Sequence, residues 1–248
     1  MIRIKVENVS KHFKIDDLKN DTILSMITRF LFNKKKAKRR KVLKNISFEV
    51  KEGEVLGIIG RNGCGKSTLL KIIADIYKPS CGKIITNGDL KYVSGFGTGI
   101  EGKLTMRENI FLIASLMNLS QKDIKKRFNE IVEFSGLKDF LDTKIYQFSS
   151  GMKTRLAFAI NIFCIKHKKP EIILLDESLG GGGDLEYSTR ALDKMNELIE
   201  GGATTIIVSH NLKTIEKYCH KVIWMHNHKI KKVGKSKEVV EKYINSFN

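Results

Sequence analysis

A glycine-rich loop between an apolar run and a predicted helix is the segment of this sequence that most directly predicts chemistry. Residues 60–68 read GRNGCGKST and match the pattern G-x-x-x-x-G-K-S/T. Glycines let backbone N–H groups turn inward around phosphate oxygens, and the following helix presents its positive end to the same anion. Lys66 can then reach the β- and γ-phosphates, and the Ser67 hydroxyl can ligate magnesium. We expect this phosphate loop to hold a nucleotide through Gly60, Arg61, Asn62, Gly63, Cys64, Gly65, Lys66, Ser67 and Thr68.

A pair of acids follows a second apolar run, IILLDE at residues 172–177. Asp176 ends a predicted buried strand, where its carboxylate can hold magnesium directly or through a water. Glu177 lies one position further and is suited to polarise an attacking water as a general base. Many buried strands end in acids, so the pair predicts hydrolysis only in combination with the phosphate loop.

Two further segments are weaker indicators when each is taken alone. Residues 148–152 read FSSGM and open a predicted helix, so Ser149 and the backbone N–H of Gly151 would lie at a helix N-terminus, where anions bind. An ordinary serine-capped helix gives the same pattern. His210 ends the apolar run TTIIVSH, where a lone histidine is more often structural than catalytic.

The cysteines and the remaining histidines predict no disulfide framework and no metal site. The four cysteines are scattered without a CxxC pair, which favours reduced thiols over a disulfide framework or a zinc site. Cys64 occupies a spacer position of the phosphate loop, and we expect alkylation of its thiol to inhibit hydrolysis and bound ATP to protect it. His226 and His228 lie near a predicted hairpin without other ligand residues, and we interpret them as surface residues.

The elements that must position these residues alternate between strands and helices. The runs VLGIIG, EIILLD and TTIIVSH predict buried strands, and STLLKIIADIY predicts a helix closed before Pro79. Between them, helical periodicity dominates, with a helix capped by Ser120 and ended by Gly136. This alternation predicts an α/β fold with a mostly parallel sheet and a helical insert. We place the core at residues 1–93 and 166–248 and a helical subdomain at 94–165.

The composition permits a single domain and excludes several classes of protein. The chain has 248 residues, of which 42% are apolar, so a packed core is expected and wholesale disorder is not. No stretch approaches the roughly 18 consecutive apolar residues of a membrane-spanning helix. The first residues lack the apolar block of a signal peptide. We therefore expect a cytoplasmic chain that acts at a membrane only through a partner.

The net charge of +18 permits nucleic acid or an anionic membrane face as a partner. Much of this charge lies in KKKAKRRK at residues 34–41, after a stretch whose apolar side chains fall on one helical face. We predict a basic amphipathic insert over residues 14–41, of which 21–41 could lie on an anionic leaflet. A solvated loop explains the basic run equally well. The apolar face could also pack on the protein's own core or on a membrane partner.

The order of the phosphate loop, the FSSGM segment, the Asp-Glu strand and the strand-terminal histidine resembles that of ABC-transporter ATPases. The resemblance implies a P-loop NTPase fold with an ABC-type core, N-terminal antiparallel strands beside the mostly parallel sheet, and a helical subdomain insert. It also implies ATP and Mg²⁺, with Ser67 and Asp176 holding the metal. In that family, Phe13 matches the residue that stacks on adenine, Glu177 orients the water and His210 contacts the γ-phosphate. The resemblance further implies that Ser149, Ser150, Gly151 and Met152 cover the nucleotide of a second subunit and that Asp184 crosses the dimer interface.

Finer features resemble the exporters of bacterial surface polysaccharides. These are QFSSGM followed by RLAF, the segment GFGTGIEGKLTMRENI, IVEFSGLKDFLD and VSHNLKTIEKYCHKVIWM. The resemblance implies export of a lipid-linked polysaccharide of O-antigen, teichoic acid or capsule type. It further implies a homodimer bound to a separate transmembrane permease through residues 95–116, at the cytoplasmic face of the bacterial inner membrane. The sequence departs from the pattern in lacking the usual loop glutamine and in an extra glycine before Asp184.

Three other interpretations stay open at this point. An ABC ATPase for a drug, lipid or peptide would share all of the chemistry and differ only in its permease. The charge invites a nucleic-acid-associated ABC ATPase, but such proteins usually pair two ATPase domains or insert a long coiled coil. One copy of each motif is present here, so we expect no nucleic acid. A P-loop kinase has no use for the FSSGM segment.

Overall fold

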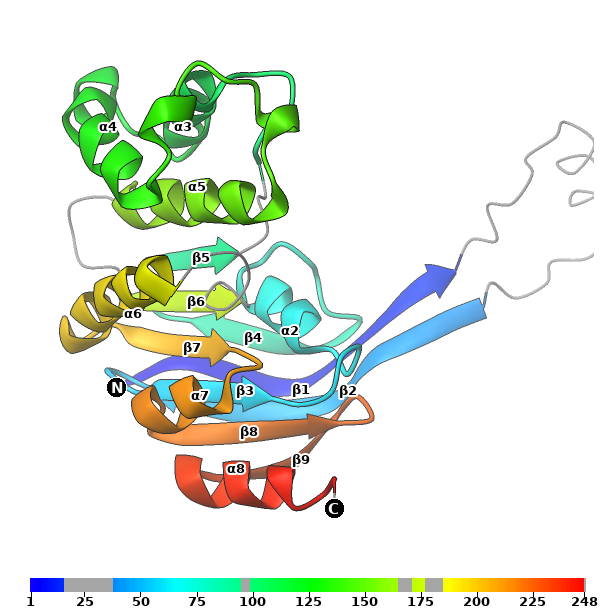
Figure 1. Cartoon of the computed structure of the whole chain (residues 1–248). Helices are drawn as coiled ribbons and strands as arrows, with labels where there is room; N and C mark the ends of the chain where they lie inside the picture. The colour runs from blue at the N-terminus through cyan, green and yellow to red at the C-terminus, as the bar shows by residue number, and fades with distance from the viewer. Residues whose placement is uncertain (16–37, 95–98, 165–170, 177–184, 248) are drawn as a thin grey trace, which may run out of the picture.

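Two β-sheets form the framework of the molecule (Figure 1), whose computed structural model describes residues 1–15, 38–94, 99–164, 171–176 and 185–247. The larger sheet has the order β5 (Leu90–Ser94), β6 (Ile172–Asp176), β7 (Thr204–Val208), β3 (Val55–Ile59), β8 (Lys221–His226) and β9 (Lys229–Lys235). All of its neighbours pair in parallel except β9, which runs antiparallel to β8. The smaller sheet is antiparallel, in the order β2 (Lys38–Lys51), β1 (Ile2–Ile15) and β4 (Cys81–Thr86). The predicted mixture of a mostly parallel sheet and N-terminal antiparallel strands is confirmed.

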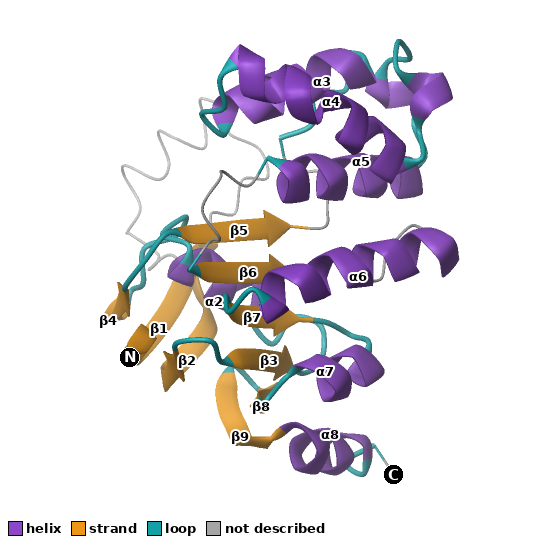
Figure 2. Cartoon of the chain, turned by 90° about the vertical axis from the view of Figure 1, so that its left-hand side faces the viewer, coloured by secondary structure: helices purple, strands orange, loops and turns teal. Residues whose placement is uncertain are grey.

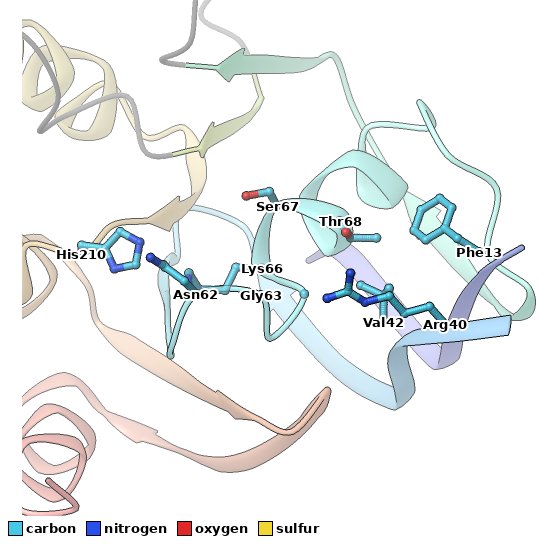
Figure 3. Close-up of a pocket in the computed structure, with 10 residues that line it drawn as sticks. Phe13, Arg40, Val42, Asn62, Gly63, Lys66, Ser67, Thr68 and His210 are labelled. Atoms are coloured by element: carbon cyan, nitrogen blue, oxygen red, sulfur yellow. The ribbon is translucent and has the colours of Figure 1, made fainter. Parts of the chain in front are cut away.

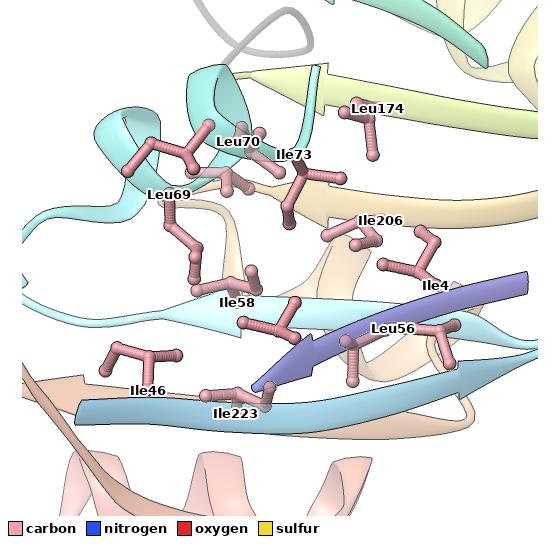
Figure 4. Packing of buried hydrophobic residues seen from close by; sticks show 14 of the residues in the cluster. Ile4, Ile46, Leu56, Ile58, Leu69, Leu70, Ile73, Leu174, Ile206 and Ile223 are labelled. Carbon is pink, nitrogen blue, oxygen red and sulfur yellow. The ribbon is translucent and has the colours of Figure 1, made fainter. Parts of the chain in front are cut away.

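Helix α2 (Lys66–Ile73) lies between the two sheets and fills the space between them. Figure 4 shows Leu69, Leu70 and Ile73 of this helix among side chains from both sheets. On the large sheet, alternate residues such as Leu56 and Ile58 face α2, because successive side chains of a strand point to opposite faces. Strands β3, β6 and β7 are buried at every position, since both faces of the sheet are covered.

A second layer of helices covers the opposite face of the large sheet (Figure 2). It contains α6 (Leu185–Glu200), α7 (Leu212–Tyr218), α8 (Ser236–Ile244) and part of α5 (Ser150–Phe163). Val55 and Ile59 of β3 contribute to this side, and the indole of Trp224 packs edge to face on Tyr243 of α8 with ring centroids 5.4 Å apart. The large sheet therefore has two apolar layers, one on each face.

Helices α3 (Met106–Leu116), α4 (Gln121–Ser135) and α5 pack into a third apolar cluster above β5, with short 3-10 turns at Lys138–Phe140 and Ile145–Gln147. Local caps fix their ends as the sequence predicts. The Ser120 hydroxyl accepts from the backbone N–H of Asp123, and Gly136 ends α4 with φ 65°. No helix among the described residues is long and apolar enough to cross a membrane.

Two segments differ from the expected pattern. Helix α2 ends at Ile73 rather than near Tyr77, because Asp75 adopts φ 57° and the N–H groups of Asp75 and Ile76 bond back to Ile72 and Lys71. Part of the basic insert is regular strand: residues 38–41 belong to β2 and pair with residues 12–15 of β1. The amphipathic helix expected near residues 22–33 lies outside the described residues.

Candidate functional site

A pocket of about 640 Å³ opens where the phosphate loop, the start of α2 and the β1–β2 strands meet (Figure 3). Segments far apart in the sequence line it: Phe13, Arg40, Val42, Asn62, Gly63, Gly65, Lys66, Ser67, Thr68 and His210. All of these except Arg40 and Val42 are sequence-predicted site residues. Among the described lining residues there is no carboxylate, whereas Arg40 and Lys66 carry positive charge, so the pocket favours an anion.

The phosphate loop lies so close to its neighbours that two of its positions exclude any side chain. Gly65 has φ 111°, and a Cβ there would stand 2.5 Å from the carbonyl oxygen of Val42. A Cβ at Gly60 would stand 2.3 Å from the carbonyl oxygen of Met225. Both distances are far below van der Waals contact, so these glycines hold the loop between β2 and β8.

Lys66 begins α2 and is buried, with 5% of its surface exposed. Its Nζ donates to the carbonyl oxygens of Gly60, at 2.8 Å, and Arg61, at 3.3 Å, so the side chain crosses the inside of the loop. The unpaired N–H groups of the first turn of α2 lie at the same place, at the positive end of the helix. Loop, ammonium group and helix end together form a site suited to phosphate oxygens.

The residues expected to hold magnesium are in contact with each other. The Ser67 hydroxyl donates to Oδ1 of Asp176 at 2.9 Å, and Asp176 is 7% exposed at the end of β6. A hydroxyl beside a buried carboxylate supplies the hard oxygen ligands that Mg²⁺ prefers, so the pair fits the metal. Tyr92 of β5, which the sequence did not indicate, donates its phenol O–H to Oδ2 of Asp176 at 2.8 Å. Glu177 and Asp184 lie outside the described residues.

Replacing Tyr92 by phenylalanine should raise the Mg²⁺ concentration for half-maximal ATP hydrolysis about tenfold. The phenol holds the Asp176 carboxylate in its orientation through a hydrogen bond. Removing such a hydrogen-bond partner of a metal ligand commonly weakens metal binding at least about tenfold. Magnesium titrations of initial rates measure the effect, whereas nucleotide binding without magnesium should be unchanged. Tyr218→Phe is the matched control, because the Tyr218 oxygen bonds only Asn196 and Lys217 among the described residues, away from the pocket. Equal magnesium requirements in both variants would exclude this role for Tyr92.

Phe13 forms the end of the pocket opposite His210 (Figure 3). Its ring packs edge to face on Tyr77, with centroids 5.6 Å apart, and the Lys11 ammonium lies 5.0 Å from the ring centroid. Phe13 pairs with Arg40 across the antiparallel strands, which explains why Arg40 reaches the pocket. An aromatic ring at this end, with cations nearby, can stack on a nucleotide base.

Replacing Phe13 by alanine should raise KM for ATP about tenfold and leave kcat within about twofold, since stacking of one base contributes about 1–3 kcal/mol. Tyrosine at position 13 should restore most of the affinity, because it preserves the ring. Steady-state kinetics over a range of ATP concentrations test both statements. An unchanged KM in Phe13→Ala would show that the base binds elsewhere.

His210 lies next to Asn62 at the loop end of the pocket, and the segment that follows it is fixed by its own hydrogen bonds. Ser209 Oγ accepts from the N–H of Asn211 at 3.0 Å, and the Asn211 side chain caps α7 by accepting from Thr214 at 3.3 Å. This local structure keeps the strand-terminal histidine at the pocket, where it can contact the outermost phosphate.

Cys64 of the phosphate loop is buried. The side chain is 6% exposed, and burial raises the pKa of its thiol. Both features should slow alkylation of this thiol, and inhibition of hydrolysis by alkylation, with protection by ATP, stays a prediction.

The FSSGM segment stands apart from the pocket, and none of the described lining residues comes from it. Ser149 caps α5 by accepting from the N–H of Met152 at 3.2 Å. Ser149 and Ser150 are exposed, while Gly151 and Met152 are partly buried. The start of α5 is therefore accessible to another molecule.

Comparison with known proteins gives concordant matches. The family model described as ABC transporter matches residues 43–180. An O-antigen export system ATP-binding protein of Klebsiella pneumoniae is 36% identical over 246 residues, covering 97% of this chain and 96% of that protein. A teichoic acids export ATP-binding protein of Bacillus anthracis is 36% identical over 241 residues, covering 97% of this chain but only 42% of the relative. A dimeric ATP-binding cassette solved in a post-hydrolysis state with ADP and Pi has a TM-score of 0.73 at 23% identity, covering 94% of this chain and 98% of that one, which shows the same fold.

Proposed function

The chain belongs to the ABC transporter family, and on that premise we propose that it binds and hydrolyses ATP to energise export of a lipid-linked surface polysaccharide. The polysaccharide is of the O-antigen, teichoic acid or capsule type, and it crosses the membrane through a separate permease. The named relatives that match almost the whole chain support this cargo. The single observation that carries hydrolysis is the contact between Ser67 and Asp176 beside the buried Lys66.

The chemistry then follows from the positions of the side chains. The phosphate loop and Lys66 hold the phosphates of ATP, and Phe13 stacks on the base. Ser67 and Asp176 would hold Mg²⁺, which neutralises phosphate charge when bound. Glu177, adjacent to Asp176 in the chain, orients the attacking water and accepts its proton. His210 contacts the γ-phosphate from the loop end of the pocket.

A homodimer completes the site in this proposal. The exposed start of α5 in each subunit covers the γ-phosphate bound by the other, which accounts for its separation from its own pocket. Asp184 crosses the interface between the subunits. The permease contacts residues 95–116, where Leu112 and Leu116 are 36% and 70% exposed. The complex lies at the cytoplasmic face of the bacterial membrane, with residues 21–41 available for peripheral contact.

Inactivating the gene for this chain and complementing it tests the cargo. Surface polysaccharide, measured by sugar and phosphate analysis of intact cells, should be lost and should return with the wild-type chain only. A variant without ATPase activity, such as Lys66→Ala, should fail to restore it. Normal surface polysaccharide in the inactivated strain would reject this cargo, while the ATPase of the purified chain would still be measurable by itself.

A further inference from the structure

A second cavity of about 350 Å³ lies on the outer side of the phosphate loop, next to the nucleotide pocket. We call it the outer cavity. Four basic side chains line it: Arg40, Arg61, His226 and His228. Among its described lining residues there is no carboxylate. Asn62, Gly63 and Arg40 line both spaces, so the outer cavity and the nucleotide pocket share one wall.

The β8–β9 hairpin builds one side of the outer cavity. Asn227 and His228 form its tip with φ values of 47° and 68°, as a two-residue mirror-image turn requires. The His228 carbonyl oxygen accepts from the backbone N–H of Lys44 at 2.8 Å, which ties the tip to β2. Arg40 comes from the same strand, so the basic side chains are placed by regular structure.

Two aromatic side chains near the C-terminus lie beside Arg61. Its guanidinium lies 5.8 Å from the ring centroid of Phe247, which packs at 5.0 Å on Tyr243. A guanidinium beside an aromatic ring keeps N–H groups available for a planar or tetrahedral oxyanion. Within the described residues, neither Arg40 nor Arg61 has a carboxylate within ion-pair distance.

His228 supplies a further indication of a ligand. Its Nδ1 is buried and has no hydrogen-bond partner among the described residues. Buried polar atoms of this kind are uncommon, because leaving one unpaired costs free energy of desolvation that no hydrogen bond offsets. An imidazole ring that turns so that Nδ1 faces the outer cavity would meet an oxyanion there, and that hydrogen bond would remove this cost.

We propose that the outer cavity is a second oxyanion site that binds a phosphate group distinct from those of the nucleotide. Two guanidinium groups and two imidazoles offer several donors around one small volume, and a phosphate presents several acceptor oxygens. Because Arg40, Asn62 and Gly63 also line the nucleotide pocket, a phosphate bound in the outer cavity should change nucleotide binding, and bound nucleotide should change phosphate binding. The phosphate can belong to free inorganic phosphate or to the headgroup of a lipid.

Titration of inorganic phosphate into the chain tests the proposal, with the nucleotide pocket first filled by excess non-hydrolysable ATP analogue and Mg²⁺. Calorimetry and the imidazole proton resonances of His226 and His228 report binding. Saturable binding is expected, weakened about tenfold or more in Arg61→Gln, as loss of a charge-assisted hydrogen bond implies. His228→Asn should also weaken it, and asparagine tolerates the positive φ at that position. Arg39→Gln, next to Arg40 on β2 but not lining the cavity, should change it less than about twofold.

A second experiment distinguishes inorganic phosphate from a lipid headgroup as the ligand. Vesicles containing phosphatidic acid are compared with vesicles of phosphatidylcholine alone, again with the nucleotide pocket filled. Retention on phosphatidic acid that is lost in Arg61→Gln assigns a lipid headgroup, and saturable binding of inorganic phosphate without such retention assigns the free anion. The proposal is overturned if neither probe binds, or if both bind equally to the wild-type chain, Arg61→Gln and His228→Asn.

Discussion

Replacing Lys66 by alanine should reduce ATP hydrolysis at least about a hundredfold, the loss found when one buried donor to a developing charge is removed. The ammonium group is 5% exposed, so water cannot easily substitute for it. Its loss also leaves the carbonyl oxygens of Gly60 and Arg61 without their partner, which loosens the loop. Steady-state phosphate release and equilibrium binding of a fluorescent ATP analogue should both decline.

Two companion variants make the Lys66 result specific. Lys66→Arg keeps the charge, but the larger guanidinium does not fit the buried space, so it should lose nearly as much activity. Lys78→Ala removes an exposed ammonium group that pairs with Asp75 at the surface and keeps the backbone carbonyl that accepts from Lys11, so it should change the rate less than about twofold. Retention of more than about a tenth of the wild-type rate by Lys66→Ala would show that phosphate is held by other groups.

Replacing Glu177 by glutamine should abolish turnover while ATP stays bound, with a rate loss of about a hundredfold or more. The amide keeps the size of the side chain but cannot accept a proton from water. The neighbouring Asp176 remains anchored by Ser67 and Tyr92, so binding of nucleotide should be preserved. Size-exclusion chromatography with ATP should then show an accumulated dimer, because hydrolysis no longer opens it.

Glu177 directly follows Asp176, the last residue of β6, and lies outside the described residues. Glu171, just before the same strand, provides the control: Glu171→Gln removes a carboxylate that bonds Arg3 and the N–H of Asp89, far along the strand from Ser67. Its hydrolysis rate should stay within about threefold of wild type. Normal hydrolysis by Glu177→Gln would place the general base elsewhere.

Much of this arrangement could be predicted because its signals are local. The runs that become β3, β6 and β7 are mostly apolar and are buried at every position, as a sheet covered on both faces requires. The caps at Ser120 and Gly136 depend on single residues and their immediate neighbours. The phosphate loop combines both kinds of signal, and eight residues that the sequence predicts for nucleotide binding line the pocket.

The residues that could not be predicted depend on contacts across the sequence. Tyr92 meets Asp176 because β5 pairs with β6, a pairing between segments distant in the chain. Arg40 reaches the pocket only through its register with Phe13. The early end of α2 was hidden because Asp75 adopts a left-handed conformation that a glycine would have signalled. The burial of Cys64 could not be predicted either, because it follows from the packing of the glycine-rich loop against β8.

The position of β3 in the large sheet governs when the protein can acquire its activity. This strand leads into the phosphate loop, yet its two neighbours are β7 and β8, which are synthesised much later. During translation the loop therefore emerges long before the strands that hold it, and its closure belongs to the slow, non-local part of folding. Nucleotide binding by a nascent chain would consequently report that the C-terminal strands have already joined the sheet.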